Sequence, residues 1–155
     1  MRILLASDHA GFARKNEIAA WLKEFTTHEV LDLGPFDTES VDYPDLANKV
    51  CSLIPKNTNE LNSLLAMPTV MGILICGSGQ GMAMRANKFA HIKAALCWNE
   101  DSAVLAREHN DANILCLGAR FCDQKLSIAI VSKFLCTSFA QGRHARRVVK
   151  MLSPV

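Results

Sequence analysis

The sequence lacks the features that mark membrane-spanning and nucleic-acid-binding proteins. Its longest apolar run, around Ile73–Cys76, is far shorter than the roughly 20 residues that a membrane-spanning helix needs. The 17 Lys and Arg residues against 15 Asp and Glu leave a net charge of only +2. A protein that neutralises many phosphates of a duplex is usually far more basic. We therefore expect a protein that binds neither a membrane nor nucleic acid.

The sequence also lacks the spacings of metal sites and disulfide frameworks. Its six cysteines, at positions 51, 76, 97, 116, 122 and 136, include no C-x-x-C pair, and its histidines include no pair at ligand spacing. Reduced thiols in a cytoplasmic protein fit this pattern better than disulfide bonds or zinc. We expect no metal site.

The N-terminal segment has only a weak similarity to a signal peptide. Arg2 precedes the apolar run Ile3–Ala6, but Asp8 and His9 end that run after four residues, too few for the hydrophobic region of a signal peptide. We interpret the run as a buried first strand and expect a cytoplasmic protein.

The length of 155 residues fits a single domain, 1–155, with no repeat and no low-complexity segment. Pro55–Val70 is the one irregular stretch, with two prolines, three asparagines and several leucines. We expect a surface excursion there with one short helix.

Short apolar runs alternate with longer amphipathic stretches, and this alternation predicts an α/β doubly wound fold. The runs, too brief for helices, are Ile3–Ala6, Val30–Leu33, Gly72–Cys76, Lys93–Cys97 and Ile114–Leu117. Helical patterns cover Phe12–Phe25, Ser102–Glu108 and Leu126–Phe134. Continuous apolarity in a strand indicates burial on both faces, which is typical of a parallel sheet. Ligands of such sheets bind at the carboxyl ends of the strands.

Two of the predicted strands end in residues suited to binding an anion or moving a proton. Asp8 and His9 follow the first strand, although Asp8 could simply cap the next helix. Three glycines at alternating positions, Gly77–Gly81, follow the third strand and precede a helix, so their amides can face an anion. Cys76 begins this loop, where the helix N-terminus would favour a thiolate. A tight turn and a small core cysteine remain the alternatives.

Two further groups of polar residues lie in the C-terminal half of the sequence. His109 and Asn110 stand where a helix ends before the fifth strand, and they could be no more than a helix end with Asn in a left-handed turn. Arg143 and Arg147 are four residues apart and share one face of a terminal helix, an arrangement that suits a phosphate. A solvated basic helix is the alternative.

Five segments together resemble the ribose-5-phosphate isomerase type B family, which also includes the galactose-6-phosphate isomerase subunits. They occur in the family's order: Ser7–Gly11, Ser40–Pro44, Ile73–Gly79, Arg107–Asp111 and Gly142–Arg147. The resemblance extends from Arg2 to about Met151. It implies a Rossmann-like three-layer α/β/α sandwich around a five-stranded parallel sheet. It also implies a homodimer or dimer of dimers with active sites shared between subunits, and aldose–ketose isomerisation of a phosphorylated sugar without a cofactor.

The resemblance implies a role for each matching residue. Cys76 matches the base that removes the proton beside the carbonyl, and Met82 stands where some members carry a Glu. His109 matches the acid that opens the sugar ring. The loop that stabilises the enediolate matches Gly77, Ser78, Gly79, Gln80 and Gly81. Positions that bind the sugar or its phosphate match Asp8, His9, Tyr43, Asn110, Arg120, Arg143, His144 and Arg147.

Ribose 5-phosphate is the expected substrate, because a chain that holds Cys76, His109 and the arginines looks complete without a dissimilar partner. A six-carbon sugar phosphate, allose or galactose 6-phosphate, is the first alternative, and the variable pair Trp98-Asn99 leaves it open. A non-catalytic sugar-phosphate-binding module is the second.

Overall fold

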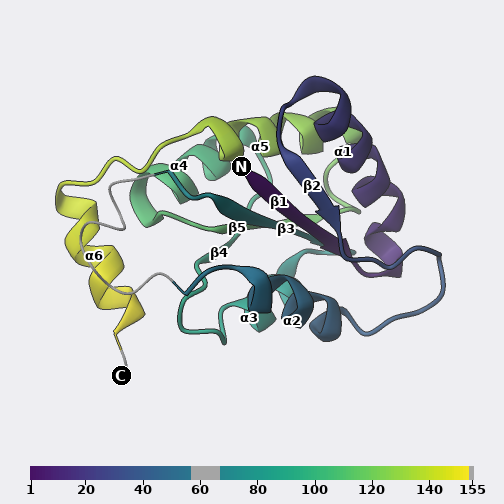
Figure 1. Cartoon of the computed structure of the whole chain (residues 1–155), viewed down its shortest axis with the longest axis horizontal. Helices are drawn as coiled ribbons and strands as arrows, with labels where there is room; N and C mark the ends of the chain where they lie inside the picture. The colour runs from purple at the N-terminus through teal and green to yellow at the C-terminus, as the bar shows by residue number, and fades with distance from the viewer. Residues whose placement is uncertain (57–66, 154–155) are drawn as a thin grey trace.

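Five parallel strands form one sheet in the order β2-β1-β3-β5-β4 (Figure 1). The computed structural model describes residues 1–56 and 67–153. The strands are β1 (Arg2–Ser7), β2 (Glu29–Asp32), β3 (Val70–Cys76), β4 (Ala94–Leu96) and β5 (Ile114–Gly118). The predicted five-stranded parallel sheet is confirmed, and each boundary lies close to its prediction because turn-forming or polar residues end the apolar runs.

Helices cover both faces of the sheet. The helical elements are η1 (His9–Gly11), α1 (Phe12–Phe25), α2 (Tyr43–Leu53), α3 (Gln80–Ala86), α4 (Glu100–Asn110), α5 (Gln124–Cys136) and α6 (Arg143–Leu152). In Figure 1, α1, α4 and α5 lie on one side of the sheet and α2 and α3 on the other. Two buried apolar clusters, one under each helical layer, form the core. The predicted three-layer α/β/α architecture is confirmed.

The sequence pattern did not predict α2. Pro44 stands in its first turn, where a missing N–H breaks no helical hydrogen bond. Leu46, Ala47, Val50 and Cys51 then face the sheet and are buried. This helix begins with Tyr43 and thereby places that side chain beside the carboxyl ends of the strands.

Polar caps extend two helices beyond their predicted bounds. Asn99 accepts a hydrogen bond from the Ser102 amide in a capping box, so α4 starts before the predicted Ser102. Asp123 accepts from the Leu126 amide and starts α5 at Gln124. Both helices also end further along the chain than predicted, α4 at Asn110 and α5 at Cys136.

Burial on both faces holds for the central strands only. Strands β1, β3 and β5 are almost fully buried. The edge strands β2 and β4 are half-buried, because each pairs on one side only, so the expectation of two buried faces is wrong for them. The helix expected within Pro55–Val70 falls largely on 57–66, outside the described residues, and Val70 begins β3.

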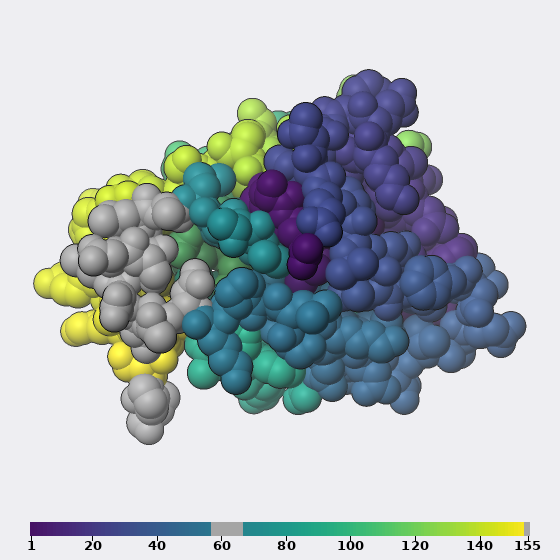
Figure 2. All heavy atoms as spheres, viewed as in Figure 1, coloured from purple at the N-terminus to yellow at the C-terminus, as the bar shows by residue number. Residues whose placement is uncertain are grey.

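Helix α6 lies at the end of the molecule from which the strands start (Figure 1). In the space-filling view its yellow atoms are at one end, and the blue atoms of the loop that leads into Tyr43 are at the opposite end (Figure 2). Only Val148 of α6 is buried. Within 1–56 and 67–153, the chain forms no helix that is long and apolar enough to cross a membrane.

Candidate active site

Cys76 ends β3, and its sulfur is held by the loop that follows. The Gly79 amide donates a hydrogen bond to Cys76 Sγ over 3.0 Å. Gly79 has φ +79°, a conformation that returns its N–H towards the thiol and that a side chain would strain. This hydrogen bond uses the Gly79 amide, so that amide is not available to bind an anion. Cys76 is buried, with an exposed fraction of 5%, and lies at the carboxyl end of β3.

Two glycines of this loop serve as platforms for other predicted site residues. A Cβ on Gly77 would lie 3.2 Å from Arg120 Cζ, and a Cβ on Gly81 would lie 2.6 Å from Tyr43 Cζ. The guanidinium and the phenol therefore rest directly on the loop backbone. The Arg120 amide also donates to the Gly77 carbonyl over 3.1 Å, which ties the ends of β3 and β5 together.

Asp8 and His9 lie beside the same loop. The Asp8 amide donates to the Ile75 carbonyl over 3.0 Å, and Asp8 Oδ1 accepts from the Gly11 amide over 2.9 Å. The capping interpretation of Asp8 is therefore correct, and one carboxylate oxygen is used inside the fold. His9 is exposed at the start of η1. We call the residues at this edge the thiol cluster: Asp8, His9, Tyr43, Cys76, Gly77, Ser78, Gly79, Gln80, Gly81 and Arg120.

The remaining predicted residues gather around a stacked pair of imidazoles. The rings of His109, on the last turn of α4, and His144, on the first turn of α6, are 4.2 Å apart between centroids and 6° from parallel. Loss of solvent, followed by the positive charges of His109, Arg143 and Arg147, lowers the pKa of His144. We call these residues the histidine cluster: His109, Asn110, Arg143, His144 and Arg147.

The left-handed residue at the end of α4 is Asp111, not Asn110. Asp111 has φ +48°, and Asn110 is the last helical residue and is exposed. The possibility that Asn110 merely forms the left-handed turn is therefore wrong. Asn110 is instead the last residue of α4 and follows His109 directly in the chain.

The thiol cluster lies at the carboxyl ends of the strands, and the histidine cluster lies at their amino ends. Arg120 comes two residues after β5 ends, whereas Asn110 comes four residues before β5 starts. The four residue-to-residue steps from Ile114 to Gly118 along β5 separate these two ends by about 13 Å, at about 3.3 Å per step. Helix α4 runs back from the carboxyl edge and so carries His109 away from Cys76. One chain does not bring the two clusters together.

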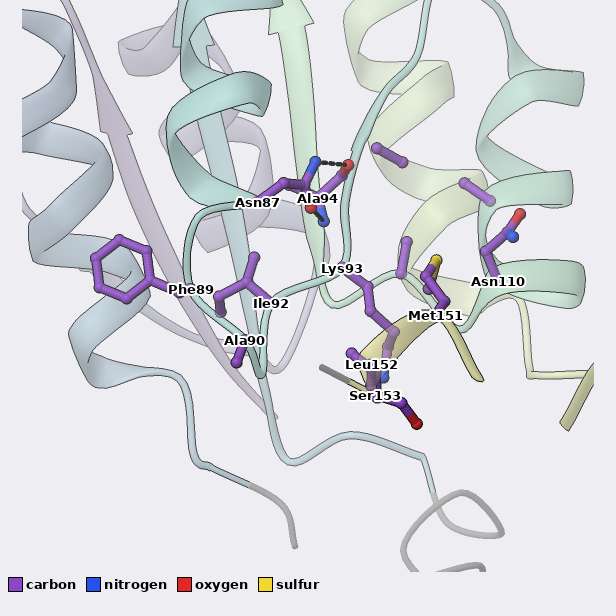
Figure 3. A pocket seen from close by; sticks show the side chains of 13 residues that line it. Asn87, Phe89, Ala90, Ile92, Lys93, Ala94, Asn110, Met151, Leu152 and Ser153 are labelled. Carbon is purple, nitrogen blue, oxygen red and sulfur yellow. Dashed lines mark hydrogen bonds between the residues drawn. The ribbon is translucent and has the colours of Figure 1, made fainter. Parts of the chain in front are cut away.

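A cavity of about 670 Å³ opens beside the histidine cluster, but its chemistry is different (Figure 3). Phe89, Ile92, Met151 and Leu152 make much of its wall. Asn110 is the one member of the two clusters among the described residues that line it. The cavity therefore does not hold the groups that the predicted chemistry needs.

A buried charged network behind the histidine cluster was not predicted. Arg107 is fully buried and pairs with Asp111, which also pairs with Lys93. The Arg–Asp spacing of four residues was visible in the sequence, but on a helix this spacing usually marks a surface pair. Burial of the pair depends on how α5 and the following segment pack on α4.

The comparisons with known proteins agree with this fold. Residues 3–151 match the Ribose/Galactose Isomerase family. Ribose-5-phosphate isomerase B of Escherichia coli is 40% identical over 147 residues, covering 95% of this chain and 91% of that protein. The crystal structure of the Thermotoga maritima ribose 5-phosphate isomerase is 45% identical, with a TM-score of 0.85, over 97% of this chain and 96% of that one.

A structure of ribose-5-phosphate isomerase B from Mycoplasma genitalium with bound ribulose-5-phosphate is also similar. It has a TM-score of 0.82 and 41% identity, and the match covers 97% of this chain and 93% of that one. The fold and these matches together define an α/β isomerase. The chain belongs to the ribose/galactose isomerase family, and the family resemblance seen in the sequence is confirmed.

Proposed function

We propose that this enzyme interconverts ribose 5-phosphate and ribulose 5-phosphate in active sites that each combine the thiol cluster of one copy with the histidine cluster of another. The single observation that carries the shared site is the separation of Cys76 and His109 by the length of β5. The substrate is supported by the names of the similar proteins and by the bound ribulose-5-phosphate in one of them.

Cys76 is the proposed base for the proton transfer. Its thiolate takes the C2 proton of the open-chain aldose, and the electrons move to the C1 carbonyl oxygen to give the enediolate. A proton passes from the C2 hydroxyl to the C1 oxygen, and the Cys76 thiol returns its proton to C1, which leaves the carbonyl at C2 and regenerates the thiolate. The Gly79 amide donates a hydrogen bond to the sulfur and so holds it beside the glycine loop. A hydrogen bond of this kind is stronger to a thiolate than to a neutral thiol.

Backbone amides of the glycine loop supply the proposed stabilisation of the enediolate. Because the Gly79 amide already donates to Cys76 Sγ, the amides of Gly77, Ser78 and Gly81 are the donors we assign to the oxyanion. Fixed donors of this type each contribute on the order of 3 kcal/mol to a transition state. Arg120 and Tyr43, which rest on the loop, enclose the sugar on that side, and Asp8 and His9 bind it from the end of β1.

His109 is the proposed acid that opens the furanose ring, since an imidazole can both donate and accept a proton. Asn110 binds the sugar beside it. Arg143 and Arg147 hold the non-reacting phosphate, with His144 beside them. Planar guanidinium groups can bind phosphate oxygens in pairs. Binding energy from this remote group positions the reacting carbons.

The test uses purified protein, ribose 5-phosphate and excess chelator, with Cys76→Ala measured in parallel. We expect ribulose 5-phosphate to form with the parent protein and not with the variant. Equal turnover in both proteins would show that a residue other than Cys76 is the base. No turnover with ribose 5-phosphate, but turnover with allose 6-phosphate or galactose 6-phosphate, would favour the six-carbon alternative.

A further inference from the structure

Arg107 is the largest fully buried side chain of the described structure, and its guanidinium donates hydrogen bonds only to protein groups among the described residues. Its Nη1 donates to Asp111 Oδ1 over 2.9 Å and to the Ala112 carbonyl over 2.6 Å. Asp111 Oδ2 also pairs with Lys93 Nζ at 3.0 Å. The guanidinium therefore fixes the left-handed turn that immediately follows His109 and Asn110.

The same guanidinium reaches the segment that leads to α6. Arg107 Nε donates to the Thr137 carbonyl over 3.3 Å, and the Ala140 amide donates to the Glu108 carbonyl over 3.0 Å. The chain then turns through Gln141 and Gly142, both at positive φ, and enters α6. The last turn of α4 and the start of α6 are thus joined by a short bonded path.

We infer that Arg107 is a positioning residue that sets His109 against His144, and that it acts on ring opening rather than on proton transfer at Cys76. This inference rests on the role proposed above for His109. His109 lies between the residues that Arg107 holds, and His144 lies at the far end of the path from Thr137. Cys76 lies at the opposite, carboxyl end of the strands.

The side-chain chemistry favours positioning over a purely stabilising role. Replacing a buried ion pair by apolar residues is often neutral or stabilising, so a buried arginine is weak evidence for stability. A guanidinium offers donors in a fixed fork and can bond Asp111 and Thr137 at once. A lysine has a single nitrogen in place of the Nε and Nη1 that make these two bonds.

Two measurements separate ring opening from proton transfer. Turnover of ribose 5-phosphate needs both steps. Ribulose 5-phosphate cannot close a five-membered ring, because its C5 oxygen carries the phosphate. Exchange of its C1 hydrogen with solvent deuterium, followed by NMR, therefore reports the Cys76 step alone. The ratio of turnover to exchange is the readout, with KM and kcat resolved for each reaction.

The variants are Arg107→Met, Arg107→Lys, His109→Ala and the double variant Arg107→Met/His109→Ala. We expect Arg107→Met to lower the ratio tenfold to a hundredfold, on the order expected for a misplaced catalytic group. Arg107→Lys should be intermediate. The double variant should match His109→Ala. Lys15→Met is the matched control, since Lys15 is also fully buried and paired, with Asp32, and it should leave the ratio at the parent value.

The inference would be overturned if the ratio of turnover to exchange in Arg107→Met equalled that of the parent protein. It would also be overturned if Lys15→Met lowered this ratio as much as Arg107→Met, or if the ratio in the double variant lay well below that of His109→Ala. If Arg107→Met does not fold, Arg107→Lys decides, and a parent ratio there overturns it. A parent ratio in His109→Ala would remove the assignment of His109 and this inference with it. A reduced ratio in His109→Ala with a normal ratio in the Arg107 variants would remove the inference alone.

Discussion

The imidazole rings of His109 and His144 stack with their centroids 4.2 Å apart and their planes 6° from parallel. The two residues come from different helices, α4 and α6. Their contact joins the end of α4 and the start of α6 into one basic surface. This surface lies away from Cys76, and that separation leads to the predictions below.

Replacing His144 should make the protein less sensitive to acid. The pKa of His144 is lowered in the folded protein, first by loss of solvent and then by the neighbouring positive charges. The unfolded chain therefore binds a proton more readily, and folding stability from this group is lost as pH falls through about 6.5. We expect the Tm of His144→Gln to fall less than that of the parent between pH 7.5 and 5.5. A larger fall in the variant would contradict a lowered pKa at His144.

Thiol labelling should distinguish Cys76 from the core cysteines. Burial raises the pKa of Cys51 and of Cys97 to about 11, and it raises the pKa of Cys116 well above its ordinary value. These thiols should stay unlabelled by iodoacetamide at pH 8, because the thiolate is the reacting form. Loss of activity should follow the modification of Cys76 and slow down when ribose 5-phosphate is present.

Exposed Cys136 is the internal control for this experiment. Cys136→Ser should be inactivated at the same rate as the parent protein. Mass spectrometry of the labelled peptides checks both statements. Inactivation that tracks Cys136, or a labelled Cys116 in a folded sample, would be the contrary result.

Gly79→Ala should destabilise the protein and disturb the thiol. The residue has φ +79°, and an added Cβ would lie 2.5 Å from Leu96 Cδ1 and 2.8 Å from the Leu117 carbonyl carbon. Overpacking and the left-handed conformation together predict a loss of roughly 2–4 kcal/mol in the free energy of unfolding. Urea denaturation measures this loss, and a change below about 0.5 kcal/mol, the usual range of surface substitutions, would show that the loop relaxes freely.

Arg143→Ala should raise KM for ribose 5-phosphate far more than Arg146→Ala does. Removing a charge-assisted hydrogen bond costs about 1.5–3 kcal/mol, which corresponds to roughly 10- to 150-fold in KM. Arg146 lies on the same helix and has no assigned contact with the phosphate, so it is the matched control. Steady-state kinetics of both variants measure the difference. Equal changes would indicate a general charge effect of α6 rather than a phosphate site.

The sequence pattern predicted the sheet well because its strands are apolar runs that end at polar or glycine residues. It missed α2, since a proline at the second helical position hides the helical pattern of Leu46, Ala47 and Val50. The family resemblance implied active sites shared between subunits, but the sequence did not assign Cys76 and His109 to opposite ends of the strands. The division of the site into two clusters follows from chain direction: residues after a parallel strand and residues before it lie at opposite edges of the sheet.

Arg107 could not be recognised as a buried residue from its neighbours in the sequence. A charged residue four positions from an aspartate usually lies on a solvated helix face. Its burial comes from Phe134 on α5 and from the carbonyl of Thr137, contacts that span many residues of chain. Such long-range packing leaves no local signal.

Subunit complementation tests the shared active site most directly. Copies of the chain carrying Cys76→Ala and His109→Ala, each with a different affinity tag, are produced together, and hybrids are isolated through both tags. Each variant alone should be nearly inactive with ribose 5-phosphate. A hybrid dimer regains one site with both groups intact, so it should show about half of the parent turnover, because a base or acid contributes about 10²–10⁴ in rate. Hybrids as inactive as the two variants would contradict a site built from two copies.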